Sequence, residues 1–220
     1  MDHRTSDNAS GTPAPATPAP TPLLHEHWSY VAPTALDDFR AADWALLDAQ
    51  RAPYYAEQQA SQVLRLLTCS RDDASFGYRV NNYRHCLQAA TLVLRDGLDE
   101  ETVVVALLHD VGFIVCPSSH GEFAAALLGA YVSAANHWML RHHTAFQLFH
   151  CHEHPHGDRD ARERWRGHAH FEWTARFIER YDQNAIDPAF VEAPLEVFEP
   201  LVRRLFARAP QPIPGEERPA

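Results

Sequence analysis

An apolar run that ends in two polar residues constrains the fold of this chain most strongly. Residues 103–108 are all apolar, and His109 and Asp110 follow them directly. A run that is apolar on every side is typical of a buried strand or a buried helix. The helix is favoured because Asp99 is suited to be an N-cap, because the acidic pair 100–101 suits the helix dipole, and because no second strand-like run lies nearby. We therefore expect a buried helix that carries a histidine and an aspartate into the interior.

The periodicity of the remaining chain is also mostly helical. We expect further helices over residues 35–50, 53–68, 79–96, 120–131, 134–149, 169–182 and 194–206. Gly97 is suited to end a helix, and Pro194 is suited to open one. The sequence therefore predicts an all-α domain over residues 35–207. The Pro-, Ala- and Thr-rich residues 1–22 cannot bury apolar area, so they and residues 208–220 are expected to be disordered tails.

Composition excludes several kinds of partner and chemistry. Lys+Arg number 19 against 29 Asp+Glu, which gives a net charge of −10 and argues against a nucleic-acid partner. All the Lys+Arg positions are arginine, so Schiff-base and lysine general-base chemistry are excluded. No apolar run reaches the roughly 18 residues of a membrane span, and no signal-peptide pattern is present. We expect a cytoplasmic protein without a membrane partner, with free thiols at Cys69, Cys86, Cys116 and Cys151.

Four histidines and two aspartates lie at the edges of the apolar, helix-like segments. They are His85, His109, Asp110, His120, His143 and Asp182. Imidazole and carboxylate groups are ligands of iron, manganese and zinc. Burying a histidine beside an aspartate is costly unless a cation offsets the charge and the unmet hydrogen bonds. Six ligands exceed what one ion with an open position needs, so the pattern predicts two metal ions with Asp110 as their bridge.

Adjacent helical residues point about 100° apart. His109 and Asp110 can therefore reach the same ion only if it lies off the end of their helix, in a space between helices. The carboxylate of Asp187 is an alternative to that of Asp182. His142 lies next to His143 and is an alternative to it, although the spacing favours His143.

These residues resemble the H…HD…D signature of the HD-domain superfamily at His85, His109-Asp110 and Asp182. The additional His120 and His143 are similar to the added ligands of its two-metal branch. Over residues 74–185 the layout resembles the mixed-valent diiron oxygenases of that superfamily, which include organophosphonate-cleaving oxygenases and myo-inositol oxygenase. The similar segments are NNYRHCLQAA, ALLHDVG and HGEFAAALL.

The resemblance implies an HD-domain helical bundle with a dinuclear metal site between helices. It implies that His85, His109 and Asp182 complete the shell of one iron. His120 and His143 would hold the second iron, with Asp110 bridging the pair. Asp110 and His120 are our candidates for catalytic residues.

The chain also departs from the resembled pattern. Phe113 stands where many HD proteins have a lysine, and Ser75 stands where the phosphonate oxygenases have a tyrosine ligand. Tyr78, after Gly77, stands where those oxygenases have an acidic residue that meets a substrate amine. These departures argue against an aminophosphonate substrate.

Substrate contacts are predicted at Tyr78 and at three arginines. Arg159, Arg162 and Arg166 would share one face of a helix and could clamp an anionic group. The alternative for them is an exposed helix that pairs with the neighbouring acidic residues. The histidine-rich run 150–156 is interpreted as a solvated loop near the mouth of the site, with a second metal site or a pocket lining as the alternatives.

We therefore expect an HD-domain metalloenzyme that acts on a small molecule. The favoured function is a diiron oxygenase with an Fe(II)/Fe(III) pair, which uses dioxygen to cleave a C–C or C–P bond next to a hydroxylated carbon of a small polar substrate. The alternative is a metal-dependent phosphohydrolase that uses manganese or another divalent metal on a phosphomonoester or nucleotide. The second alternative is a non-catalytic binding protein with a vestigial site.

Overall fold

The computed structural model describes residues 27–213 of the chain. The chain divides into two compact units, Met1–Gln50 and Arg51–Ala220, and the division falls within a long helix. Every regular element in the described residues is helical, as the periodicity predicts. The expected tail 1–22 lies outside the described residues.

The first unit contains a short 3₁₀ helix and the beginning of α1. The 3₁₀ helix spans Leu36–Asp38, and α1 spans Ala41–Thr68. The ring of Phe39 packs on that of Trp44, with centroids 4.9 Å apart. The side chain of Gln50 exchanges hydrogen bonds with the backbone of Ser29, which holds the segment before the helix against its first turns.

The prediction of separate helices over 35–50 and 53–68 was wrong. The two segments form one continuous helix with Pro53 inside it. An interior proline removes the hydrogen bond to the carbonyl four residues earlier. That carbonyl belongs to Ala49, which is exposed, so water can replace the missing donor.

The second unit holds the remaining helices. They are α2 (Asn82–Arg95), α3 (Glu100–Leu108), α4 (His120–Leu128), α5 (Ala134–Gln147), α6 (Phe171–Arg180) and α7 (Leu195–Phe206). Short 3₁₀ helices lie at Leu148–His150, Ala161–Trp165 and Asp182–Asn184. Helix α2 begins later than the sequence predicts, because Asn81 caps it, whereas α5 begins at the predicted residue after its cap Ser133 and ends two residues early.

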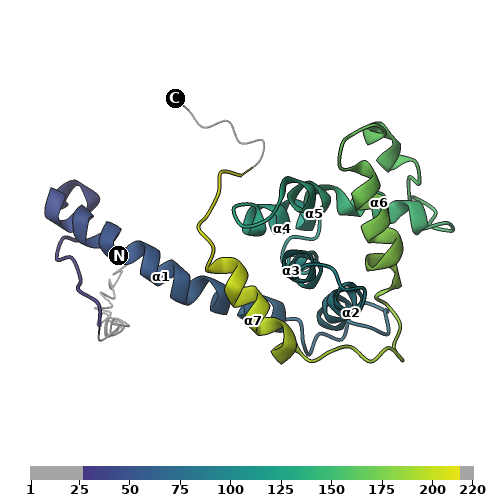
Figure 1. The fold of residues 1–220 in the computed structure, drawn as a ribbon, viewed down its shortest axis with the longest axis horizontal. Helices are drawn as coiled ribbons and strands as arrows, with labels where there is room; N and C mark the ends of the chain where they lie inside the picture. Colours follow the sequence, from purple (N-terminus) through teal and green to yellow (C-terminus); the bar gives the residue numbers. More distant parts are fainter. Residues whose placement is uncertain (1–26, 214–220) are drawn as a thin grey trace, which may run out of the picture. The chain divides into compact units, whose positions relative to one another are not determined.

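Helix α3 is the centre of the second unit, as the apolar run predicts. Residues 103–108 are almost fully buried. The helix contacts α2, α5 and α7, and Figure 1 shows it among them. Asp99 caps it, because its side chain accepts a hydrogen bond of 2.8 Å from the backbone N–H of Thr102. Gly97 ends α2 with a φ of 73°, a conformation in which glycine carries no steric penalty.

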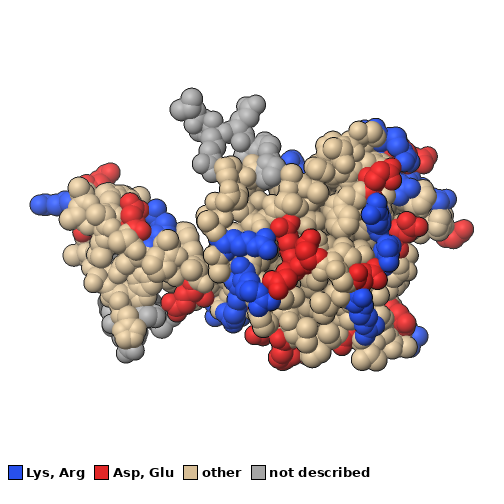
Figure 2. Space-filling model, in the orientation of Figure 1, with Lys and Arg blue, Asp and Glu red and all other residues tan. Residues whose placement is uncertain are grey.

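Charged side chains of both signs are mixed on the face of the second unit that Figure 2 shows. Arg204 of α7 forms a 2.7 Å ion pair with Glu100 at the start of α3. Arg208 pairs with Glu101 at 3.1 Å, and the backbone N–H of Gln211 donates to Ala130. Residues 208–213 belong to the segment predicted to be a disordered tail, and two of them, Arg208 and Gln211, contact the bundle.

Two further expectations concern the described residues. All four cysteines lie among them and are free thiols. None of the helices in residues 27–213 combines the length and the apolar character that crossing a membrane requires.

Candidate metal centre

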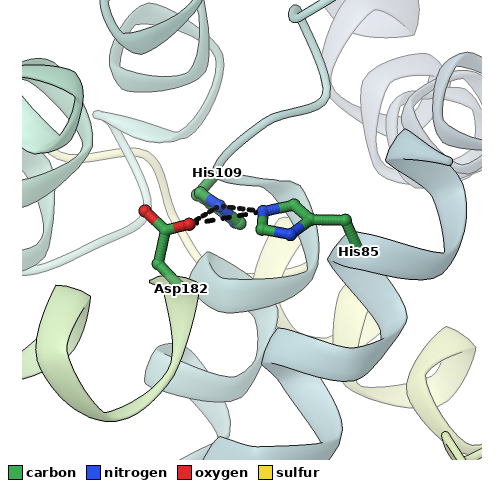
Figure 3. Close-up of side chains that lie close together, drawn as sticks. All are labelled: His85, His109 and Asp182. Atoms are coloured by element: carbon green, nitrogen blue, oxygen red, sulfur yellow. Dashed lines mark hydrogen bonds and ion pairs between the residues drawn. The ribbon is translucent and has the colours of Figure 1, made fainter. Parts of the chain in front are cut away.

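The six predicted ligands come together in the second unit. They form two groups of three, and within each group the ligand atoms lie within 4.8 Å of one another. One group is His85, His109 and Asp182, and the other is Asp110, His120 and His143. Each of the six residues is at most 8% exposed. Figure 3 shows the first group, in which the two imidazoles and the carboxylate point toward a common space.

Helix ends position most of these side chains. His109 follows the last residue of α3, and Asp110 lies in the turn beyond it. His120 is the first residue of α4, and Asp182 opens the 3₁₀ helix after α6. The polar pair therefore leaves the end of its helix, where both side chains can face one space between helices, as the sequence analysis expects.

A backbone carbonyl fixes the orientation of each histidine ring. The Nδ1 atoms contact the carbonyl oxygens of Ala185 (3.1 Å), Ala106 (2.8 Å), Pro117 (3.1 Å) and Leu140 (2.7 Å), for His85, His109, His120 and His143 respectively. A carbonyl can only accept, so Nδ1 must carry the proton and donate it. In a neutral ring this leaves a lone pair on Nε2, and all four Nε2 atoms face the cluster. The same second-shell arrangement orients histidine ligands in metal sites.

Pairs of these Nε2 atoms oppose one another. His85 and His109 bring them to 3.1 Å, and His120 and His143 bring them to 3.2 Å. Two neutral imidazoles would place two lone pairs in contact. In addition, Oδ2 of Asp182 is buried and has no hydrogen-bond partner among the described residues. A positive charge between these atoms would satisfy all of them, so the donor set fits metal cations.

The carboxylate of Asp110 faces both groups. Its Oδ1 lies 3.1 Å from Nε2 of His143 and 3.3 Å from that of His120. Its Oδ2 lies 3.5 Å from Nε2 of His85 and 3.9 Å from that of His109. One oxygen toward each group is the arrangement expected of a bridging carboxylate. The side chain of Asn82 donates to the backbone oxygen of Asp110 at 2.8 Å and so ties this turn to α2.

The electrostatics of the cluster favour bound positive charge. Burial alone would raise the pKa of Asp110, but His109, His143 and His85 outweigh it and hold this pKa well below its usual value. The pKa of Asp182 is lowered in the same way, by His109 and His85 against the effect of burial. Burial lowers the pKa values of His85 and His109, but the carboxylates outweigh it and the net shift is upward. Both carboxylates are therefore ionised, and the Nε2 atoms of His85 and His109 beside them attract cations or protons. Burial, the largest effect, lowers the pKa of His120.

The geometry separates the predicted ligands from their alternatives. Asp187 is exposed, and its Oδ1 accepts from the backbone N–H of Ala189 at 2.8 Å. His142 packs between Trp138 and Trp165, with ring centroids 4.4 and 4.5 Å away. Neither residue belongs to a described cluster of possible ligands.

The histidine-rich run 150–156 has a solvent-facing conformation. It ends a 3₁₀ helix and continues as turns, and residues 152–156 are exposed. Within the described chain, this run contributes no member to the two groups of possible ligands. The solvated-loop interpretation therefore agrees with the structure.

A cavity of about 120 Å³ opens beside the cluster. His85 and Asp110 line it together with Tyr78, the predicted substrate contact. None of its described lining residues is an arginine. The predicted clamp of Arg159, Arg162 and Arg166 thus does not reach this cavity.

The three arginines have local partners instead. Arg166 makes hydrogen bonds of 2.7 and 2.8 Å with both carboxylate oxygens of Glu163. The guanidinium of Arg162 lies 3.3 Å from the centroid of the Phe149 ring, and Arg159 donates to the Phe149 carbonyl at 3.2 Å. The segment between them forms a 3₁₀ helix rather than an α-helix. Arg166 is exposed and pairs with Glu163, as the exposed alternative predicts, whereas the side chain of Arg162 is only 12% exposed.

Two polar residues near the cluster were missed from the sequence. Gln147 lines the cavity, and its Nε2 donates to Oδ1 of Asp182 at 3.2 Å. Thr144 places its hydroxyl 3.2 Å from Nε2 of His120. The sequence could have indicated Gln147, because this residue lies four positions after His143 and therefore on the same face of α5.

Comparison with known proteins adds no family assignment. No protein-family model matches the sequence, and no curated protein is significantly similar to it. The HD-domain resemblance stays a prediction, carried by the motifs around His85, His109-Asp110 and Asp182.

Proposed function

We propose that the protein is a two-metal enzyme and that its reaction is the oxidation of a hydroxylated carbon by dioxygen, with cleavage of an adjacent C–C or C–P bond. The observation that carries the proposal is the position of Asp110. Its two carboxylate oxygens face two buried groups of ligands, and the residue also lines the cavity. Two irons held there would supply a Lewis acid for the substrate hydroxyl and a redox partner for dioxygen.

The protein itself would hold and orient the reacting groups. The carbonyls of Ala106 and Leu140 fix the tautomers of His109 and His143, so that Nε2 is available for a metal. The carboxylates of Asp110 and Asp182 would offset part of the metal charge. The six ligand residues are each at most 8% exposed, and this burial would shield reactive oxygen chemistry from bulk water.

Gln147 is a candidate positioning residue for this site. Its amide nitrogen donates to Asp182, which leaves its carbonyl oxygen available at the cavity. This contact holds Oδ1 of Asp182 beside the two imidazoles of its group. We infer that Gln147 orients the carboxylate while a substrate occupies the space next to it.

The composition of the cavity favours the oxygenase over a phosphohydrolase. Phosphate recognition in proteins commonly uses arginine or lysine. The chain lacks lysine, and the described residues around the cavity include no arginine. A phosphate ester would therefore meet no cationic side chain among the described lining residues, and neither would the phosphonate group of a C–P substrate. Cleavage of a C–C bond next to a hydroxylated carbon fits this lining best.

Anaerobic purification with supplied iron tests the proposal. We expect about two irons per chain, a mixed-valent EPR signal after partial oxidation, and loss of iron in His85→Ala, His109→Ala and Asp110→Ala. His142→Ala is the matched control, because this histidine adjoins His143 but faces Trp138 and Trp165. Manganese in the site, with release of phosphate from generic esters and no oxygen uptake, would instead support the phosphohydrolase. Retention of all metal by the three ligand variants would contradict the site.

A further inference from the structure

Exposed apolar side chains gather at the mouth of the cavity. Phe76, Tyr78, Ile114 and Ile186 all line it and are between 48% and 71% exposed. They come from three separate segments, namely the loop before α2, the turn after α3 and the segment after the last 3₁₀ helix. Single exposed apolar residues are ordinary, but a group that rims a cavity is typical of a binding site.

We define the apolar rim of the cavity as Phe76, Tyr78, Phe113, Ile114 and Ile186. The three aromatic rings form one wall of it. The rings of Phe76 and Phe113 are nearly parallel, with centroids 6.0 Å apart, and Tyr78 packs edge-on against Phe76 at 5.4 Å. The wall therefore buries part of each ring against another ring. Phe76 is still 71% exposed, and none of the described residues covers this exposed part.

The amide side chains of the lining donate hydrogen bonds within the protein. Asn81 donates to the backbone oxygens of Arg71 and Asp73, and Asn82 donates to that of Asp110. Gln147 donates to Asp182. Asn81 thus uses two N–H donors, and Asn82 and Gln147 use one each, so these amides hold the loop and the ligands in place.

The charged side chains that line the cavity disfavour a substrate with a second anionic group. The acidic side chains of the lining are Asp73 and Asp110, and no arginine lies among the described lining residues. Oδ1 of Asp73 accepts from the backbone N–H of Ser75 at 2.6 Å, which closes the turn that carries Phe76. Asp110 faces the two groups of histidines. A second anionic group on the substrate would find no cation on this rim.

The size of the cavity limits what can enter it. Its volume of about 120 Å³ is well below the roughly 300–1,000 Å³ of sites that enclose drug-sized ligands. A small oxygen-bearing head can reach His85 and Asp110, whereas the rest of a larger molecule must lie over the rim.

From these observations we infer that the substrate carries a hydrocarbon group next to its hydroxylated carbon. The head would bind at the metal centre, and the alkyl or aryl body would lie on the apolar rim. This substrate class rests on the proposed function, and it replaces the small polar molecule expected from the sequence. It predicts that affinity depends on the apolar area of the ligand and little on any distal charge.

A series of 2-hydroxyalkanoates, from lactate to 2-hydroxyoctanoate, tests this inference by calorimetry on the metal-loaded protein. Each added methylene should tighten binding about two- to fourfold until the rim is covered. Phe76→Ala and Ile186→Ala should flatten this dependence, so that 2-hydroxyoctanoate loses more affinity than lactate does. Val197→Ala is the control, because Val197 is an exposed apolar residue of α7 outside the rim and should keep the full dependence.

The outcomes separate the inference from the proposed function. If metal binds and lactate binds, but longer chains bind no more tightly, the apolar body is excluded while the metal centre stands. If the protein takes up no metal, the proposed function fails, and the rim is tested on the metal-free protein with butanol and octanol by hydrogen exchange at residues 76–78. Stronger protection by octanol would support the rim, and equal protection would overturn it. Self-association that protects Tyr78 without ligand would also overturn it, in favour of an interface between two copies.

Discussion

The Nε2 atoms of His85 and His109 lie 3.1 Å apart, although each ring directs its Nδ1 proton to a backbone carbonyl. In neutral rings this contact opposes two lone pairs in a buried site. It becomes favourable only when a proton or a metal ion lies between the rings and the nearby carboxylate of Asp182. The fold therefore prepares a place for positive charge before any ligand binds.

Replacing the two site aspartates should have different effects on metal content. Asp182→Asn removes a charge from one group of ligands, so we expect about one metal ion per chain to remain. Asp110→Asn removes the carboxylate that faces both groups, so we expect both sites to weaken. Elemental analysis after reconstitution measures this. Asp187→Asn is the matched control, because this exposed carboxylate accepts from the backbone N–H of Ala189 and belongs to neither described group of ligands. Equal metal content in all three variants would contradict the assignment.

Removal of metal should destabilise the fold. A ligand that binds only the folded state at a free concentration of 100 times its Kd stabilises it by about 2.7 kcal/mol. Chelation should therefore lower the free energy of unfolding by about that amount per occupied site, because buried carboxylates and opposed imidazoles lose their counter-charge. Urea unfolding with and without chelator measures the difference. The Asp110→Asn variant should show almost no such difference, and an equal response to chelator in this variant would argue against the site.

Gly121 should be required where α4 approaches α5. A Cβ at this position would lie 2.8 Å from the backbone oxygen of Leu140 and 3.4 Å from Cε1 of His143. We expect Gly121→Ala to cost about 1–3 kcal/mol of stability, since backbone must shift to admit the methyl group. The shift should also weaken the metal group that contains His120 and His143. Ala126→Ser, on the exposed side of α4, should leave both stability and metal content unchanged.

His142 should give the metal-free protein a pH-dependent stability. Burial, followed by the charge of Arg141, lowers its pKa from 6.5 to about 4. Between these values the unfolded chain binds a proton that the folded ring does not, so the free energy of unfolding falls as the pH drops. The ring is only half-buried, and we expect a loss of about 1–2 kcal/mol, complete below pH 4 and absent above 6.5.

The His142→Phe variant isolates this contribution. The difference in unfolding free energy between wild type and variant should vary between pH 6.5 and 4 and be flat on either side. Both proteins are unfolded with urea across this pH range. Because the ligand residues are the same in both, their contribution cancels in the difference. A difference that is constant with pH would contradict the lowered pKa of His142.

Local sequence patterns could predict the helices and the members of the site. The apolar run 103–108 can be buried on all sides only in the middle of a bundle, and that burial gives His109 and Asp110 their surroundings. Capping by Asp99 and the end of α2 at Gly97 depend on residues within one turn, so they are readable from the chain. Pro53 was misread because a proline usually ends a helix, and its tolerance here depends on exposure of the preceding turn.

The surroundings of the site could not be predicted in the same way. The carbonyl of Ala185 reaches His85 across 100 residues of sequence, and Phe76 meets Phe113 from a different segment. Such contacts depend on how helices pack rather than on local pattern. The arginine clamp failed to reach the cavity for the same reason, because a helical face shared by Arg159, Arg162 and Arg166 requires an α-helix that this segment does not form.

The most direct test is the iron content and magnetic coupling of protein that has been reconstituted with Fe(II) without oxygen and then partly oxidised. Two buried groups that share Asp110 predict about two irons per chain and an EPR signal from a coupled mixed-valent pair. That signal should disappear in Asp110→Ala. Failure to bind iron, manganese or zinc, or two irons that remain magnetically independent, would contradict the central claim.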